Sequence, residues 1–103
     1  MITSNDNEKL KLVRKLAARK WRERERRFAT EGEDLLDAGL AAGAEPLEVL
    51  VAAGSGLAGI EGEPDLLDGV SQLGSGTRVI AIWPLPDPRG PLAGRFRAYL
   101  HAL

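Results

Sequence analysis

Cysteine is absent from this sequence of 103 residues, and histidine occurs once, as His101. Without cysteine there is no disulfide framework, and a single histidine cannot complete a zinc site of Cys and His ligands. We therefore expect no bound metal. No Ser or Cys nucleophile lies in a suitable setting for His101 to activate it. A surface position is predicted for His101, and no catalytic residue is assigned.

Long hydrophobic runs are also missing. No stretch approaches the roughly 18 apolar residues that a membrane-spanning helix needs, and the N-terminus lacks the basic-then-apolar order of a secretory signal. The sequence predicts no membrane contact and a cytoplasmic location. Hydrophobic residues make up 44% and charged residues 28% of the chain, which is typical of one globular domain at this length.

The overall charge of −1 conceals two segments of opposite sign. Residues 1–27 hold 10 Lys and Arg against 4 Asp and Glu, a net charge of +6. The other 76 residues hold 4 against 11, a net charge of −7, and the two values sum to −1. Such a split is typical of an arm that binds a polyanion. We expect a basic helical arm over residues 1–27 and the body of the domain over residues 28–103.

A long amphipathic helix is predicted near the N-terminus. Asn5 and Glu8 have the spacing of a capping box, so the helix is expected to begin just after Asn5. Its helical phase continues through Trp21. The apolar face holds Leu10, Val13, Leu16 and Ala17. The opposite, exposed face is basic and holds Lys11, Lys15, Arg19 and Arg22.

Short apolar runs alternate with helical segments along the rest of the chain. Strands are predicted at 28–30, 48–52 and 78–83, and helices at 31–42, 64–73 and from 92 onward. A proline-rich connector over residues 84–91 precedes the last helix. This alternation predicts an α/β domain in which helices cover both faces of a small sheet.

Two patterns that suggest a functional site have structural explanations. The glycine-rich residues 54–62 are predicted to form a loop. Within them, residues 54–59 spell G-x-G-x-x-G, but Gly62 and Pro64 prevent the helix that a dinucleotide requires directly behind this pattern. The acids within residues 31–37 crowd the start of a predicted helix, where the helix dipole accounts for them. Glu31 is accordingly expected to be structural.

The opening of the chain resembles a known family. ITSNDN with Lys11, followed by RKWRERERRFATEG and DAGLAAGAEP, is similar to the N-terminal substrate-binding domain of SpoU/TrmH-type RNA 2′-O-ribose methyltransferases. The resemblance covers residues 2–46, and VSQLGSGTRVIAIWPLP is similar to a later segment of the same domain. The matching positions are Asn7, Lys11, Arg22, Arg27, Phe28, Glu31 and Gly32.

The resemblance implies both a fold and a role. The implied fold is a three-layer α/β/α sandwich with a small mixed sheet, similar to the ribosomal proteins that bind kink-turns. The implied role is to bind a structured RNA, ribosomal RNA in particular, for a knotted methyltransferase domain expected after residue 103. That domain would bind S-adenosylmethionine, dimerise and methylate a ribose 2′-hydroxyl. Its motifs are absent from these 103 residues, so no cofactor is expected here.

The basic stretch is the predicted RNA-binding site, because Arg and Lys pair with phosphates and Arg also stacks on exposed bases. The residues assigned to it are Asn7, Lys11, Arg14, Lys15, Arg19, Arg22, Arg24 and Arg27. Trp21 lies on the shoulder of the apolar stripe and is open to two interpretations, packing in the core or stacking on a base. Phe28, within a strand, is expected in the core.

Two other functions remain open on the sequence alone. One is a stand-alone adaptor for RNA or an RNA–protein particle, built on the same sandwich without a catalytic partner. The other is a protein-interaction domain whose basic helix docks on an acidic partner.

Overall fold

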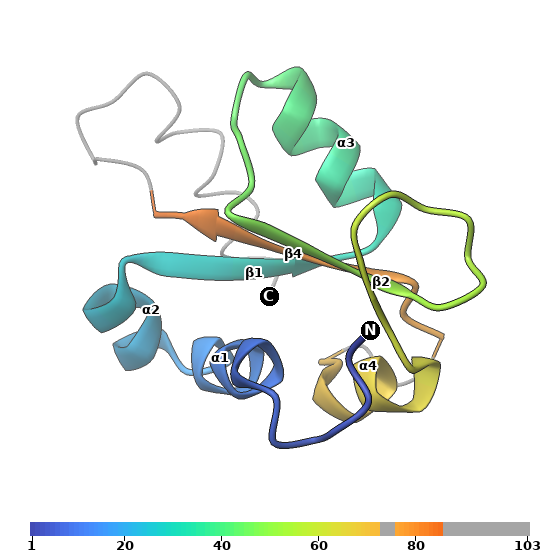
Figure 1. Cartoon of the computed structure of the whole chain (residues 1–103). Coiled ribbons are helices and arrows are strands. Elements are labelled where there is room, and N and C mark those ends of the chain that lie inside the picture. The colour runs from blue at the N-terminus through green and yellow to red at the C-terminus, as the bar shows by residue number, and fades with distance from the viewer. Residues whose placement is uncertain (73–75, 86–103) are drawn as a thin grey trace.

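The computed structural model describes residues 1–72 and 76–85 (Figure 1). Most of the predicted connector over residues 84–91, the last predicted helix and His101 lie outside the described residues. No helix in the described part of the chain combines the length and the apolar character needed to cross a bilayer. The elements follow one another as α1 (Glu8–Leu16), α2 (Arg19–Glu25), β1 (Arg27–Glu31), α3 (Glu33–Ala41), β2 (Glu48–Ala52), β3 (Ile60–Gly62), α4 (Pro64–Val70) and β4 (Val79–Pro84).

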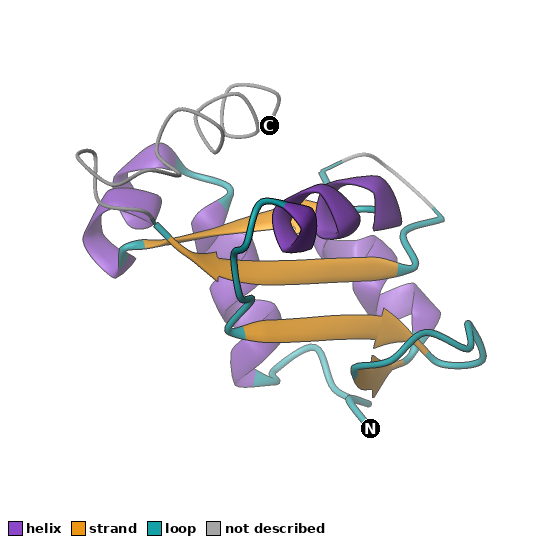
Figure 2. Ribbon diagram, turned by 90° about the horizontal axis from the view of Figure 1, so that it is seen from above, coloured by secondary structure: helices purple, strands orange, loops and turns teal. Residues whose placement is uncertain are grey.

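The strands form one mixed sheet in the order β1-β4-β2-β3 (Figure 2). β4 runs antiparallel to both β1 and β2, and β3 runs parallel to β2. Residues 79–83 of β4 are all buried, because this apolar strand has a neighbour on each side and helices over both faces. Ile2 forms a parallel bridge to Gly62, so the N-terminus is joined to the sheet beside β3.

Helices cover both faces of the sheet, with α3 on one face and α1 and α4 on the other (Figure 1). Successive side chains of β4 point to opposite faces. Ile80 and Ile82 belong to the larger core cluster, on the side of α1 and α4, whereas Ala81 and Trp83 belong to the smaller cluster with Phe28. The three-layer α/β/α sandwich with a small mixed sheet is therefore confirmed. The larger cluster comprises Ile2, Leu10, Val13, Leu16, Leu50, Ala52, Leu67, Val70, Ile80 and Ile82.

A glycine lets α3 approach the sheet closely. Gly39 is buried within α3 against the ring of Trp83. A Cβ at this position would lie 2.8 Å from Cζ2 and 2.9 Å from Cζ3 of Trp83. The ring is also held from the other side, because Trp83 Nε1 donates a hydrogen bond of 2.9 Å to Thr30 Oγ1 on β1. Only a residue without a side chain fits at Gly39.

The predicted N-terminal helix is two helices in the structure. α1 begins after Asn7 rather than Asn5, because Asn7 Oδ1 accepts a hydrogen bond of 2.9 Å from Lys9 N. α1 ends at Leu16, and α2 follows Ala18, whose backbone is extended with φ −97° and ψ 133°. The prediction of one continuous helix capped by Asn5 was wrong.

The break has a tertiary cause. The buried residues of α1 end with Leu16, and α2 buries none, so a straight helix beyond Leu16 would have no apolar contact to hold it. β1 must also return to pair with β4. The turn before Arg19 and the left-handed conformation of Arg26, with φ 57°, bring the chain back to the sheet at Arg27.

Three smaller boundaries also differ from the prediction. β3 occupies the end of the predicted loop 54–62, α4 ends at Val70 rather than near residue 73, and Glu31 belongs to β1 rather than to the helix that follows. Residues 54–59 form a loop that leads into β3 and not into a helix. The geometry needed for a dinucleotide is therefore missing from this segment, as predicted.

Glu31 fixes the connection between α4 and β4. Its Oε1 accepts hydrogen bonds from Ser71 Oγ at 2.5 Å and Thr77 Oγ1 at 2.8 Å, and its Oε2 accepts one from Gln72 N at 2.6 Å. The residue is only 8% exposed. A buried carboxylate with three donors is satisfied where it lies. The predicted structural role of Glu31 is confirmed.

Candidate nucleic-acid interface

Exposed cations line α1, α2 and the start of β1. Residues 19–27 alone contain six Lys and Arg against two Glu. Six of the eight residues predicted to contact RNA belong to this exposed set, and Lys20 and Arg26, which the prediction missed, also belong to it. The whole set, here termed the α1–α2 basic surface, is Lys11, Arg14, Lys15, Arg19, Lys20, Arg24, Arg26 and Arg27.

The acids within this surface form weak ion pairs. Arg19 Nε lies 3.3 Å from Glu23 Oε1, and these side chains are 84% and 63% exposed. Lys15 Nζ lies 3.9 Å from Glu25 Oε1. Exposed pairs of this kind contribute about 0 to 1 kcal/mol. A phosphate can therefore replace either carboxylate at small energetic cost.

Four other exposed cations have no ionic partner among the described residues. None of the five ion pairs found within residues 1–72 and 76–85 involves Lys20, Arg24, Arg26 or Arg27. These four residues flank or follow Trp21 in the sequence. They leave positive charge uncompensated around α2.

Trp21 is the aromatic centre of this surface. Lys15 Nζ lies 5.0 Å from the centroid of its ring, Arg24 Cζ lies 5.1 Å away and Lys20 Nζ lies 5.8 Å away. The residue is only partly buried, and it belongs to neither core cluster. Core packing, one of its two interpretations, is therefore wrong. Phe28, by contrast, is fully buried, as predicted.

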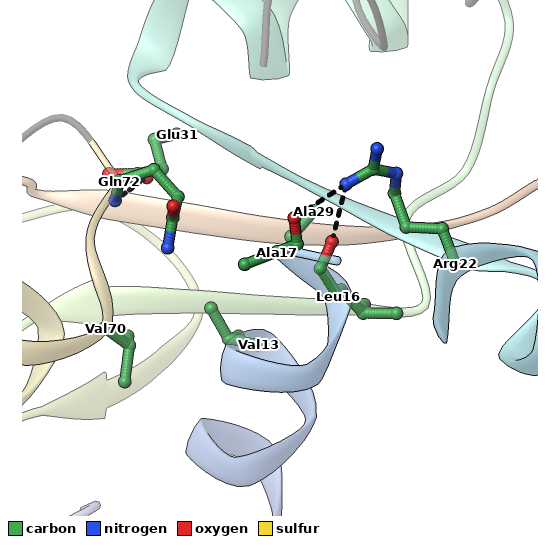
Figure 3. A pocket seen from close by; sticks show the side chains of 8 residues that line it. All are labelled: Val13, Leu16, Ala17, Arg22, Ala29, Glu31, Val70 and Gln72. Atoms are coloured by element: carbon green, nitrogen blue, oxygen red, sulfur yellow. Dashed lines mark hydrogen bonds between the residues drawn. The ribbon is translucent and has the colours of Figure 1, made fainter. Parts of the chain in front are cut away.

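Arg22 has a structural role that the helical pattern did not reveal. Its Nη1 donates hydrogen bonds to the carbonyl oxygens of Leu16, at 3.0 Å, and Ala17, at 3.1 Å (Figure 3). These carbonyls lie at the C-terminal end of α1, where no helical amide follows to pair with them. Arg22 is half-buried beside a small pocket that Val13 and Ala29 also line. Its expected place on the exposed face was wrong, and contact with RNA stays a prediction.

Reversing the charge of Arg22 is expected to destabilise the fold by about 1 to 2 kcal/mol. Arg22→Glu removes two hydrogen bonds and puts a carboxylate at the negative end of the α1 dipole. Urea unfolding measures the change in free energy. Arg19→Glu is the matched control, because it makes the same charge change at an exposed position of α2 and should cost under about 0.5 kcal/mol. Equal losses in the two variants would contradict the proposed role of Arg22 at the end of α1.

Asn7 caps the N-terminal end of α1, whereas Lys15, which lies over Trp21, is near the C-terminal end of the same helix. Its Oδ1 is occupied by the cap to Lys9 N, so only the side-chain amide remains to donate to RNA. Arg14 also has a local partner, because its Nη2 donates to the backbone oxygen of Asn5 at 2.7 Å. The cations nearest Trp21 are therefore the better-placed part of the predicted site.

The groove at the start of α3 has the opposite charge. Gly32, Glu33, Asp34 and Thr77 line it, together with Arg78. Arg78 Nε lies 3.6 Å from Glu33 Oε1, so its charge is already opposed. Three carboxylates, those of Glu31, Glu33 and Asp34, beside one paired guanidinium disfavour an approaching phosphate. The electrostatics thus direct a polyanion to α1 and α2.

The sequence from residue 7 to residue 82 matches the family described as the MRM3-like substrate binding domain. The chain belongs to this family. Among curated proteins, none matches the sequence significantly.

Solved structures resemble this substrate-binding domain over most of its length. A crystal structure of an RNA 2′-O ribose methyltransferase is 28% identical, with a TM-score of 0.72 over 87% of this chain. Two crystal structures of an rRNA methyltransferase from Sinorhizobium meliloti, one with AdoMet bound, are 21% and 20% identical, with TM-scores of 0.66 and 0.67. They cover 81% and 82% of this chain. The chain spans 39% of the first structure and 36% of each of the others.

In this substrate-binding domain, five of the seven residues that carried the family resemblance divide into two groups, besides Asn7 and Arg22 described above. Phe28 and Glu31 are buried and hold the fold, and Gly32 makes the turn into α3 with φ 97°, a conformation that favours glycine. Lys11 and Arg27 are exposed, and Lys11 pairs with the exposed Glu8 at 3.7 Å. The pattern F-x-x-E-G is thus architectural, whereas the exposed cations before it are free to act on a ligand.

Proposed function

We propose that this domain binds structured RNA through the α1–α2 basic surface and presents it to a methyltransferase domain of the same protein. The observation that carries the proposal is the group of exposed cations around Trp21, namely Lys15, Lys20 and Arg24, in a chain whose overall charge is −1. Membership of a substrate-binding family and likeness to an RNA 2′-O ribose methyltransferase support RNA as the ligand.

The distribution of charge favours one orientation of the RNA. Residues 1–27 carry +6 and the rest of the chain carries −7. At physiological salt a phosphate senses charges within roughly 8 Å, so it responds to the local surface rather than to the net charge. The acidic remainder repels the rest of the RNA, which leaves α1 and α2 as the face of approach.

The finer parts of the proposal concern the whole protein. We propose ribosomal RNA as the substrate to test first, since the SpoU/TrmH resemblance implies ribosomal or transfer RNA. S-adenosylmethionine is the expected methyl donor, and we place its site, like the dimer contact, outside residues 1–103.

RNA binding by this domain is expected to weaken steeply with salt. Three to six phosphate contacts at about 0.7 to 0.9 each predict that log K falls with log salt with a slope of roughly 2 to 5. Fluorescence anisotropy with labelled ribosomal RNA fragments measures this between roughly 50 and 200 mM salt. Polyglutamate serves as a competitor that represents an acidic protein partner. Affinity that does not change with salt, or equal displacement by polyglutamate, would count against the proposal.

A further inference from the structure

One aromatic side chain in the described part of the chain lies outside the core. Phe28 and Trp83 are both 0% exposed. Trp21 is partly exposed and lies on α2, which buries no residue. An indole on a surface helix keeps apolar area in contact with water, so it does not gain the free energy that burial of that area would give. Trp21 is instead surrounded by three cations, which is a setting that also suits a nucleotide.

The cations hold the indole without sealing it. Each exposed cation–π contact is worth about 0.5 to 1 kcal/mol. A base that stacks on an aromatic side chain contributes about 1 to 3 kcal/mol. A base can therefore take the place of Lys20 or Arg24 over the ring. The displaced cation remains within reach of the phosphate of the same nucleotide, with which it can form a charged hydrogen bond.

The position of the ring is fixed before any ligand arrives. Lys15 belongs to α1, whereas Lys20 and Arg24 belong to α2, so the ring lies at the junction of the two helices. Arg22, the neighbour of Trp21, ties α2 to the end of α1 through the carbonyls of Leu16 and Ala17. A ring held in this way loses little conformational entropy when a base stacks on it.

Bases inside an A-form duplex are already stacked on their neighbours, and side chains cannot read them in the deep, narrow major groove. Only an unpaired base from a loop, bulge or strand end can reach an indole on a surface helix. We infer that Trp21, with Lys15, Lys20 and Arg24, forms a stacking platform for one unpaired base, so that this domain selects RNA with an extruded nucleotide over continuous duplex. The inference rests on the proposed function and narrows its substrate class.

The test compares two synthetic RNA hairpins of closely similar length, one with a single unpaired adenosine in its stem and one fully paired. The full 103-residue chain has two tryptophans, and because Trp83 is 0% exposed, Trp21 is the accessible fluorophore. We expect the bulged hairpin to bind about 5- to 150-fold more tightly, which corresponds to about 1 to 3 kcal/mol of stacking. The bulged hairpin should also quench the tryptophan emission more strongly.

Variants of Trp21 separate stacking from packing. Trp21→Ala should lower the affinity for the bulged hairpin to that for the paired one, with little change for the paired hairpin. Trp21→Phe should keep most of the preference, and Trp21→Leu, which retains apolar bulk without a π-face, should lose it. Urea unfolding of each variant shows whether it is folded.

Each alternative result has a distinct meaning. If the wild-type protein binds both hairpins equally, or if Trp21→Leu keeps the preference, the stacking platform is wrong while RNA binding through the basic surface stands. If neither hairpin binds and ribosomal RNA fragments also fail to bind, the proposed function is wrong, and the inference of a stacking platform, which rests on it, is wrong as well.

Discussion

Replacing Lys20, Arg24 and Arg27 together with glutamine is expected to lower RNA affinity on the order of 100-fold. All three cations are exposed and lack an ionic partner among the described residues, so each is free to neutralise a phosphate. Losing three contacts at about 0.7 to 0.9 each should also reduce the slope of log K against log salt by about 2 to 3. Anisotropy titrations at several salt concentrations measure both quantities.

A control with the same net charge separates location from total charge. The triple glutamine variant changes the charge from −1 to −4, and Thr3→Glu, Ala41→Glu and Ala58→Glu together also change it from −1 to −4. These three control positions are exposed and lie outside the α1–α2 basic surface. The control should keep most of the affinity and nearly the full slope. If both variants lose affinity equally, RNA responds to total charge and not to a defined face.

Gly39→Val is expected to destabilise the domain by about 2 to 3 kcal/mol, because the new side chain overlaps the ring of Trp83. Moving the ring away would break the hydrogen bond that Trp83 Nε1 donates to Thr30 Oγ1 on the neighbouring strand. For a domain of this size such a loss lowers Tm by roughly 8 to 24 °C. Thermal unfolding followed by circular dichroism measures the shift.

The matched control is a second helical glycine. Gly69 in α4 is exposed, and a Cβ there would meet nothing within 4 Å. Gly69→Ala should therefore be neutral or stabilise the domain by up to about 1 kcal/mol, since alanine favours helix over glycine. A Gly39→Val protein as stable as Gly69→Ala would show that α3 does not pack on Trp83 as described.

Much of the sandwich could be predicted from the sequence because apolar runs and helical periodicity were strong. β2 lies where the apolar run over residues 48–52 predicts it, and Leu10, Val13 and Leu16 form the buried face of α1. Patterns of this kind report burial directly, since most buried side chains are apolar. β3 was missed because it has only three residues, among glycines, and owes its pairing to β2.

The geometry of the candidate site was harder to predict. Ala17 and Ala18 are good helix formers, so no local signal marks the break between α1 and α2. Arg22 looks like any exposed cation in the sequence, because its hydrogen bonds to Leu16 and Ala17 arise only once the chain has turned. The charge of the site can be counted from the sequence, whereas the arrangement of its cations around Trp21 depends on that turn.

The central position of β4 determines when the domain can fold during synthesis. β1 and β2 do not pair with each other, and each pairs with β4, the last of the described strands. Trp83 and Thr30, joined by a hydrogen bond, are 53 residues apart in the chain. On the ribosome, the edges of β1 and β2 that pair with β4 therefore stay unpaired until residues 79–84 emerge. The helices that bear the cations are made first, but the sheet that orients them is completed last.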